Sequence, residues 1–276
     1  MRSVAATHGL KITRIHTHIG SGSDPAVWQR VSGLSLALCR SFSDVTTLNL
    51  GGGYKVARMA YEKGTDLALV GAPVRDAFVA FAADTGRRLQ LTIEPGTFLL
   101  ANACSLVSTV QDVTTTSSRT FLKLDTGMTE VLRPSLYGAQ HPLVVVPGGD
   151  SAAAGQQQQQ RSHASHSTPQ HLPPQPTRRY VVVGHCCESG DLLSCAPGEP
   201  ETIAERELAT AAIGDMCVVE GTGAYCSGMA TKNYNSFPEA AEVLRDTAGK
   251  LHVVRSRQTL EQITANERAV PAGAAL

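Results

Sequence analysis

The fold is decided by residues 46–53, Thr-Thr-Leu-Asn-Leu-Gly-Gly-Gly, where a short β-prone run ends in three consecutive glycines. On its N-terminal side, residues 11–20 alternate polar and apolar side chains before a Gly-Ser loop, as a half-buried strand does. On its C-terminal side, residues 89–93 are β-prone and stop at Glu94-Pro95-Gly96. The sequence therefore predicts three short strands, each followed by a loop of polar or glycine residues.

Helical patterns lie between these strands. Residues 25–41 repeat apolar side chains at helical spacing, Asp24 is a candidate N-cap, and Pro25 suits the first turn. A second helix is expected over 72–84. Alternating strands and helices predict a parallel α/β sheet, and ligands of such sheets bind at the loops where the strands end.

After about residue 100 the pattern changes to short β-prone runs with few helical stretches. We therefore predict an α/β part over residues 1–103 and a second, mostly β domain over 104–276. The expected strands of the second domain are residues 105–113, 120–124, 143–146, 180–184, 216–220 and 251–255.

Residues 147–179 interrupt the second domain with Gln, Pro, Ser and His and almost no large apolar side chains. A segment of this composition buries too little apolar surface to offset its chain entropy, so we expect a disordered insert. We interpret its three histidines, His163, His166 and His171, as composition rather than as a metal site.

The composition excludes several classes of partner. The 276 residues carry 24 Lys and Arg against 24 Asp and Glu, and so lack the net positive charge with which proteins bind nucleic acid or anionic lipid. The longest apolar runs fall far short of the roughly 20 residues that cross a bilayer, and the N-terminus lacks an apolar secretory core. Seven scattered cysteines fit reduced thiols of an intracellular protein. A small-molecule ligand is the remaining expectation.

The polar groups at the strand ends admit ordinary structural roles when each is taken alone. A glycine triplet is a common turn as well as a phosphate cradle, and His18 or Cys187 can be a packing residue. The run His185-Cys186-Cys187 invites a zinc site, but no second ligand pair follows at the required spacing, and we predict no metal.

Taken together and in order, eight motifs resemble the fold-type III decarboxylases that depend on pyridoxal phosphate (PLP), a family that holds the diaminopimelate, ornithine and arginine decarboxylases. The diaminopimelate branch fits best. The resemblance implies the later strands and helices of a PLP-binding TIM-type barrel, followed by a β-barrel or Greek-key-like domain. The motifs are HIGS (18–21), LNLGGGY (48–54), EPG (94–96), DTGM (125–128), RPSLYGAQH (133–141), CESGD (187–191), GAY (223–225) and NYNS (233–236).

PLP is the cofactor that this resemblance implies, because these enzymes work through it. In the family pattern Glu94 hydrogen-bonds the pyridinium nitrogen, His18 stacks on the ring, and Tyr225 donates its hydroxyl to the phosphate. The implied cofactor-binding residues are His18, Ser21, Gly52, Gly53, Glu94, Gly96 and Tyr225.

The resemblance also implies a homodimer with shared active sites. Cys187 and Glu188 then come from the neighbouring subunit, and the Cys187 thiol is the acid that protonates the α-carbon after CO2 leaves. The implied catalytic residues are Cys187, His18 and Glu94, and the implied substrate-binding residues are Arg133, Tyr137 and Glu188.

The implied reaction is the PLP-dependent decarboxylation of meso-2,6-diaminopimelate to L-lysine, the last step of lysine biosynthesis. This substrate carries a distal carboxylate, which the planar guanidinium of Arg133 can hold with two hydrogen bonds. Two alternatives remain open at this point, an ornithine- or arginine-type decarboxylase and a non-catalytic, regulatory relative. The glutamine tract favours a eukaryotic source, with the cytoplasm or the plastid stroma as the expected location.

The sequence departs from the family pattern in two places. Thr97 stands where an arginine usually follows Glu-Pro-Gly. The family's Schiff-base lysine lies on an early barrel strand, before HIGS, so we expect the chain as given to be inactive, with too few barrel strands to close and an apolar face exposed. The lysines whose surroundings do not match that position are Lys11, Lys55, Lys63, Lys123, Lys232 and Lys250.

Overall fold

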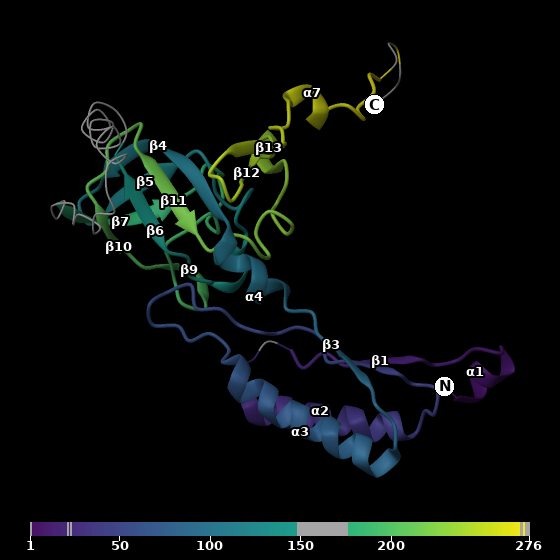
Figure 1. Cartoon of the computed structure of the whole chain (residues 1–276). Coiled ribbons are helices and arrows are strands. Elements are labelled where there is room, and N and C mark those ends of the chain that lie inside the picture. Colours follow the sequence, from purple (N-terminus) through teal and green to yellow (C-terminus); the bar gives the residue numbers. More distant parts are fainter. Residues whose placement is uncertain (1, 21, 23, 148–175, 271–272, 274–276) are drawn as a thin grey trace. The chain divides into compact units, whose positions relative to one another are not determined.

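The chain folds into two compact units, Met1–Cys104 and Ser105–Leu276, each with its own apolar core (Figure 1). The first unit is α/β and the second is built of β-strands, so the predicted fold class of α/β plus β is correct. Within the part of the chain that the structure describes, no helix is both long and apolar enough to span a membrane. This computed structural model describes residues 2–20, 22, 24–147, 176–270 and 273.

The first unit contains a parallel three-stranded sheet in the order β1 (Arg14–His16), β2 (Thr47–Asn49), β3 (Gln90–Thr92). Helices α2 (Pro25–Arg40) and α3 (Leu67–Thr85) pack side by side, and both contribute to the core beneath β2 (Figure 1). The predicted strand–helix alternation is therefore present, although the strands are shorter than the β-prone runs. The short helices of this unit are α1 (Arg2–Thr7), α4 (Gly96–Leu100) and the 3-10 turn η1 (Ala101–Ala103).

The helix starts follow their capping residues. The Asp24 carboxylate accepts the N–H of Ala26 at 2.9 Å, which confirms the predicted start of α2. The predicted start of α3 at residue 72 is wrong. The helix begins five residues earlier, because Asp66 caps two backbone N–H groups of the first turn and Pro73 is accommodated in the helix interior.

The core of the first unit centres on Trp28, which is buried and lies with its ring 4.4 Å from that of Tyr54, between centroids. Leu48 of β2 and Leu50 just after it are also fully buried and belong to the same cluster. Because β2 is the central strand, its burial holds the two flanking strand ends in register.

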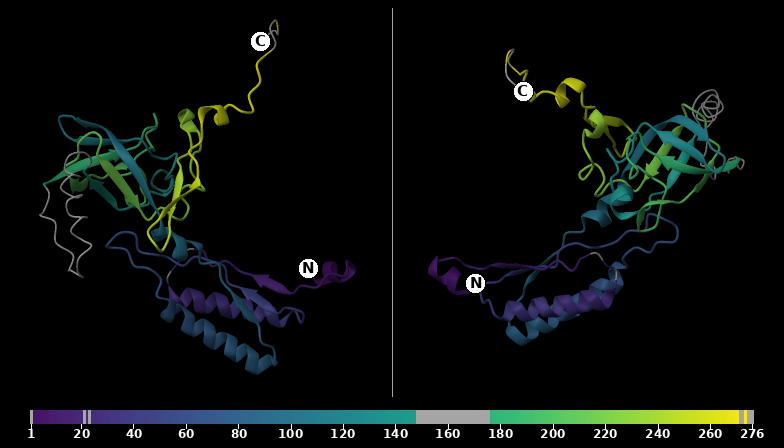
Figure 2. Two further views of the ribbon diagram at one scale, coloured as in Figure 1. Left: turned by 45° about the horizontal axis from the view of Figure 1, so that its top comes forward. Right: turned by 180° about the vertical axis from the view of Figure 1, so that it is seen from behind.

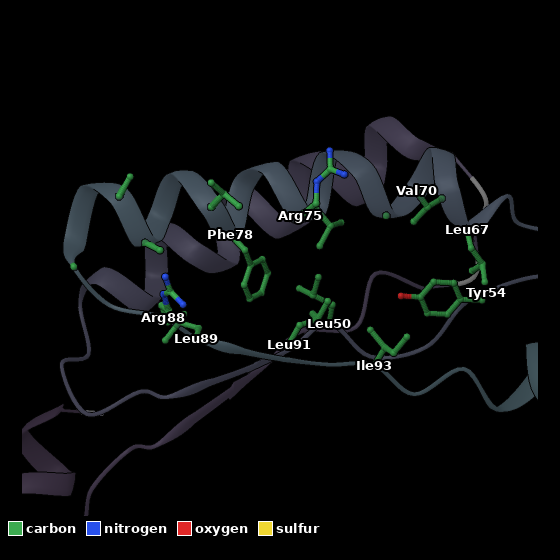
Figure 3. A pocket seen from close by; sticks show the side chains of 16 residues that line it. Leu50, Tyr54, Leu67, Val70, Arg75, Phe78, Arg88, Leu89, Leu91 and Ile93 are labelled. Carbon is green, nitrogen blue, oxygen red and sulfur yellow. The ribbon is translucent and has the colours of Figure 1, made fainter.

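An apolar groove of about 820 Å³ runs between α3 and the β3 side of the sheet (Figure 3). Phe78 of α3 faces Leu91 and Ile93 across it, and these last two side chains remain 43% and 41% exposed. The expectation of an exposed apolar face beside the sheet is therefore correct.

The second unit contains a six-stranded sheet in the order β10-β7-β5-β4-β11-β6. The two outermost strands of this order contact each other, so the sheet curls into a nearly closed barrel (Figure 2). Only the β5–β7 pair is parallel within this described sheet. Its strands are β4 (Ser105–Thr115), β5 (Thr120–Leu124), β6 (Leu143–Val146), β7 (Thr177–Val183), β10 (Arg206–Ala209) and β11 (Met216–Glu220).

Besides this sheet, the described residues of the second unit form two hairpins and three short helical turns. The hairpins pair β8 with β9 and β12 with β13, and of these four strands the sequence predicted only β13. The others are short or rich in polar residues, so their sequences carry little alternation. These elements are β8 (Cys195–Ala196), β9 (Glu199–Ile203), β12 (Glu242–Arg245), β13 (Leu251–Arg255), α5 (Arg133–Tyr137), η2 (Tyr234–Ser236) and α7 (Leu260–Ile263).

The predicted insert, residues 147–179, is too long at its C-terminal end. Thr177–Arg179 form the start of β7 and pair with β10, where Arg178 lies opposite Leu208. Backbone hydrogen bonds stabilise this polar end of the strand although it buries little apolar surface. Residues 148–175, including His163, His166 and His171, lie outside the described residues.

We predict that Leu48→Ala lowers the free energy of unfolding of the first unit by about 3 kcal/mol, because it leaves a cavity in a fully buried strand. Trp28 is the single tryptophan of the sequence, so its fluorescence during urea denaturation reports on this unit. The matched control is Leu34→Ala in α2, where the side chain is 66% exposed and the loss should stay below about 1 kcal/mol. Equal losses in the two variants would contradict the assignment of the core.

Candidate active site

The ends of the three parallel strands bring three loops together in the first unit. His18 follows β1, Gly51–Gly53 follow β2, and Glu94 follows β3. The N–H of Glu94 donates to the carbonyl of Gly51 at 2.8 Å, and the N–H of Gly52 donates to Nδ1 of His18 at 3.3 Å. We call these residues the strand-end cluster.

Glycine is required in this cluster because the loops approach one another closely. A Cβ atom on Gly52 would lie 2.5 Å from the carbonyl oxygen of Glu94, and one on Gly51 would lie 2.6 Å from Nδ1 of His18. Gly51 and Gly53 also have positive φ angles of 71° and 96°. Glycine-rich loops after a strand are one of the backbone arrangements that bind phosphates in proteins.

Two neighbours orient the carboxylate of Glu94, whose side chain is about half exposed. The amide of Asn49 donates from Nδ2 to Oε1 of Glu94 at 2.6 Å, and its Oδ1 accepts the N–H of Gly51 at 2.8 Å. Nε2 of His16 lies 3.9 Å from Oε2 of Glu94. Sequence reasoning gave Asn49 and His16 no role, although a polar residue within a buried strand, as Asn49 is, was a usable signal.

Of the remaining predicted residues of the first unit, some lie near this cluster and one lies outside the residues that the structure describes. Gly96 opens α4, and its N–H donates to the carbonyl of Glu94 at 2.9 Å. Thr97, which replaces the arginine of the family pattern, lies in the same short helix. Ser21 lies outside the described residues.

In the second unit, Arg133 and Tyr137 stand at the two ends of α5. Nη1 of Arg133 donates to Nε2 of His141 at 3.1 Å, so Nε2 is the unprotonated nitrogen and Nδ1 donates to the carbonyl of Glu220 at 2.8 Å. His141 is buried and thereby anchors the half-buried guanidinium, whereas Tyr137 is exposed.

The CESGD loop of the second unit exposes Cys187 and Glu188. Oε1 of Glu188 accepts the N–H of Gly190 at 3.2 Å, and the N–H of Cys187 donates to Oδ1 of Asn235 at 3.4 Å. Tyr225 is 61% exposed and has a positive φ of 58°, a conformation that is uncommon outside glycine.

Asp191, the last residue of CESGD, is buried and had no predicted role of its own. Its Oδ1 accepts the N–H of Met128 at 2.7 Å and its Oδ2 accepts the N–H of Cys186 at 2.8 Å. Burial raises the pKa of the Asp191 carboxyl, and the two backbone hydrogen bonds oppose that rise. A Cβ atom on Gly127 or Gly184 would overlap this carboxylate, which explains both glycines.

In the run His185-Cys186-Cys187, for which a zinc site was considered, the histidine contacts an aromatic ring and a hydroxyl group. The ring of His185 stacks on Phe237 with 3.5 Å between centroids, and its Nε2 hydrogen-bonds the hydroxyl of Thr129 at 2.7 Å. Among the described residues, no group of three His, Cys, Asp or Glu side chains is arranged to hold a metal ion.

The predicted residues thus form two groups, one in each unit. His18, the glycine run and Glu94 meet in the first unit, while Arg133, Cys187 and their neighbours belong to the second. Their convergence around one cofactor stays a prediction.

Comparison with known proteins connects both groups to one family. The family model described as pyridoxal-dependent decarboxylase, C-terminal sheet domain, matches residues 45–223. The diaminopimelate decarboxylase of Escherichia coli (strain K12) is 34% identical over 265 residues, covering 96% of this chain and 58% of that protein. A crystal structure of diaminopimelate decarboxylase matches with a TM-score of 0.81 at 32% identity, covering 96% of this chain and 57% of that one. The chain spans little more than half the length of these relatives.

A third match is the crystal structure of diaminopimelate decarboxylase from Helicobacter pylori complexed with L-lysine. It has a TM-score of 0.70 at 26% identity and covers 93% of this chain and 54% of that chain. The likeness therefore extends over both units and not only over the sheet domain that the family model describes.

We predict that Gly52→Ala destabilises the first unit by about 2 kcal/mol, because the added methyl group meets the backbone of Glu94. The same substitution at Gly33, in the interior of α2 with nothing within 4 Å of the added atom, should stabilise the unit by about 0.5–1 kcal/mol. Urea denaturation followed by Trp28 fluorescence measures both. A neutral or stabilising Gly52→Ala would show that the loops are less closely packed than described.

Proposed function

The chain belongs to the pyridoxal-dependent decarboxylases, and we propose that its protein removes a carboxylate from meso-2,6-diaminopimelate to give L-lysine. The observation that carries this proposal is the strand-end cluster, in which the imidazole of His18 and the backbone N–H of Glu94 each hydrogen-bond the glycine run. The 34% identity to the Escherichia coli diaminopimelate decarboxylase supports the choice of substrate. The relatives named above are bacterial, which gives the plastid expectation no support.

The residues of the strand-end cluster fit PLP. Gly52 and Gly53 are the proposed backbone partners of the phosphate, and the imidazole of His18 lies beside them, because its Nδ1 accepts the N–H of Gly52. The Asn49 amide binds one oxygen of Glu94 and leaves the other able to accept a pyridinium N–H. PLP supplies a sink for the electron pair that is released when CO2 leaves the α-carbon. Glu94 keeps the pyridine nitrogen protonated, and so maintains that sink.

Arg133 is the proposed partner of the substrate's distal carboxylate. A guanidinium has five N–H donors, and His141 accepts from one nitrogen, Nη1, so the rest of the planar fork remains to bind two oxygens. The buried His141 limits the rotation of the arginine, which lowers the entropy lost when the substrate binds. Tyr137 and Glu188 are exposed side chains of the same unit and are the proposed partners of the distal amine.

Cys187 is the proposed proton donor to the α-carbon. Its thiol belongs to an exposed residue, whose backbone is held by Asn235. We further propose a homodimer in which one protomer supplies Cys187 and Glu188 to the cofactor bound by its partner. Tyr225, also exposed, is the proposed donor to the phosphate.

The second candidate substrate class is ornithine or arginine. Ornithine has no distal carboxylate, so the anchored Arg133 has no anion to bind in that case. A non-catalytic, regulatory relative is the remaining alternative, and activity measurements on the full gene product distinguish it.

We expect the full gene product with PLP to turn over meso-diaminopimelate faster than ornithine, measured by CO2 release. Arg133→Leu should raise the KM for diaminopimelate at least about tenfold, because a charge-assisted pair contributes roughly 1.5–3 kcal/mol. The KM for ornithine should change little. Turnover of ornithine equal to or above that of diaminopimelate would overturn the proposed substrate.

Replacing the proposed proton donor should separate catalysis from cofactor binding. Cys187→Ala is expected to lower kcat about 100-fold, the lower end of general acid–base effects, while PLP affinity stays unchanged. Cys104→Ala is the matched control, because Cys104 is also exposed but lies outside the motifs. The acid role fails if both variants keep the parental kcat.

A further inference from the structure

Three loops of the second unit contact one another beside the buried residue Asp191. They are residues 125–130, residues 184–191 and residues 231–237, and each contains one of the motifs DTGM, CESGD and NYNS. We call them the three-loop cluster. The first and second of these loops are joined by Asp191 itself, which receives one backbone N–H from each, those of Met128 and Cys186.

This junction depends on the negative charge. Asp191 is only 4% exposed, and a buried carboxylate is tolerated where hydrogen bonds replace its water. Each of its two oxygens accepts one backbone N–H, so a neutral amide of the same shape cannot serve both, because its nitrogen is a donor.

A second connection between the same two loops runs through side chains. The Thr129 hydroxyl donates to Oε2 of Glu130 at 2.5 Å, so its oxygen accepts the Nε2–H of His185 at 2.7 Å. Oε2 of Glu130 also accepts the N–H of Gly127 at 3.0 Å. Because the Thr129 hydroxyl donates to Glu130, Nε2 of His185 is the donor in its hydrogen bond to Thr129. Burial raises the pKa of the Glu130 carboxyl as it does that of Asp191.

The third loop closes over the other two. Phe237 stacks on His185, and the N–H and hydroxyl of Thr231 both donate to the carbonyl of Met128, at 3.3 and 3.1 Å. Oδ1 of Asn235 accepts the N–H of Cys187. Asn235 has a positive φ of 51°, a left-handed conformation that asparagine adopts more readily than most other residues.

The two adjacent cysteines of the three-loop cluster differ in their exposure to solvent. Cys187 is exposed, whereas Cys186 is partly buried beside Asp191. Burial, reinforced by the charge of Asp191, raises the pKa of the Cys186 thiol to about 12, so this thiol is a poor nucleophile.

We propose that Asp191 and Asn235 are positioning residues that hold the CESGD loop so that Cys187 is presented to the reaction partner and Cys186 is withheld. This inference rests on the proposed role of Cys187 but concerns the geometry of the loop. It accounts for a buried charge and an asparagine with a positive φ that the proposed reaction itself does not use.

Thiol alkylation tests the proposal without cofactor or substrate. Iodoacetamide labelling of the full chain, quantified for each cysteine by fragment-ion mass spectrometry, should modify Cys187 first and Cys186 much more slowly. Asp191→Asn should raise the Cys186 rate about tenfold, since it removes a charge-assisted bond and the neighbouring negative charge. Cys195 and Cys217, which are fully buried, should stay protected and so report that the barrel remains folded.

The matched control is Asp246→Asn. Asp246 also accepts two backbone N–H groups, those of Ala248 and Lys250, but in the exposed turn between β12 and β13. Its substitution should leave the Cys187-to-Cys186 labelling ratio unchanged. An unchanged ratio in Asp191→Asn, or an equal change in the control, overturns the proposal.

If Asp191→Asn also exposes Cys195 and Cys217, the barrel has unfolded in that variant. A second variant, Asn235→Gly, then tests the proposal. Asn235→Gly tolerates the positive φ and removes only the acceptor for the Cys187 N–H. The Cys187-to-Cys186 ratio should then shift about threefold or more, and a ratio equal to that of the parent chain overturns the proposal. The labelling experiment needs no turnover. A labelling result that contradicts the positioning proposal therefore leaves the decarboxylase proposal intact, and an inactive enzyme leaves the labelling result intact.

Discussion

The close approach of the backbone at Gly51 and Gly52 to His18 and Glu94 is the constraint on which the first unit depends. A Cβ atom fits neither at Gly51 nor at Gly52, and the parallel order of β1, β2 and β3 brings their ends to one edge. The buried central strand keeps the three ends aligned, because Leu48 and Asn49 cannot shift without opening the core. The contacts of His18 and of the Glu94 backbone with the glycine run are therefore a consequence of packing several residues away.

The second unit organises its polar loops by a different force. Where the first unit relies on steric exclusion, the second relies on a buried carboxylate that accepts backbone hydrogen bonds from two segments. Such a group is costly to bury and is strongly destabilising when its partners are removed, so it specifies one arrangement of the loops. The absence of a side chain at Gly127 and Gly184 makes room for it, just as Gly52 makes room for Glu94.

Local sequence was sufficient for part of the fold. Asp24-Pro25 identified the start of α2, and the β-prone runs at 120–124, 143–146 and 216–220 became strands with those bounds. It was insufficient at α3, which begins five residues before the predicted start, and at the start of β7, where arginines pair as strand residues. In those places distant backbone and capping partners outweigh the apolar pattern that the prediction used.

By itself, the sequence determined which chemical groups follow each strand of the first unit, because each strand and the residues at its end are adjacent in the chain. It did not determine that Asn49 binds Glu94, that His141 anchors Arg133, or that Asp191 receives the N–H of Met128. The tertiary structure decided which of these polar groups are buried and which partners they meet. The hydrogen bonds of Asp191 show why. Met128 and Asp191 are 63 residues apart, and whether a carboxylate meets water or a buried N–H depends on which segments the fold brings beside it.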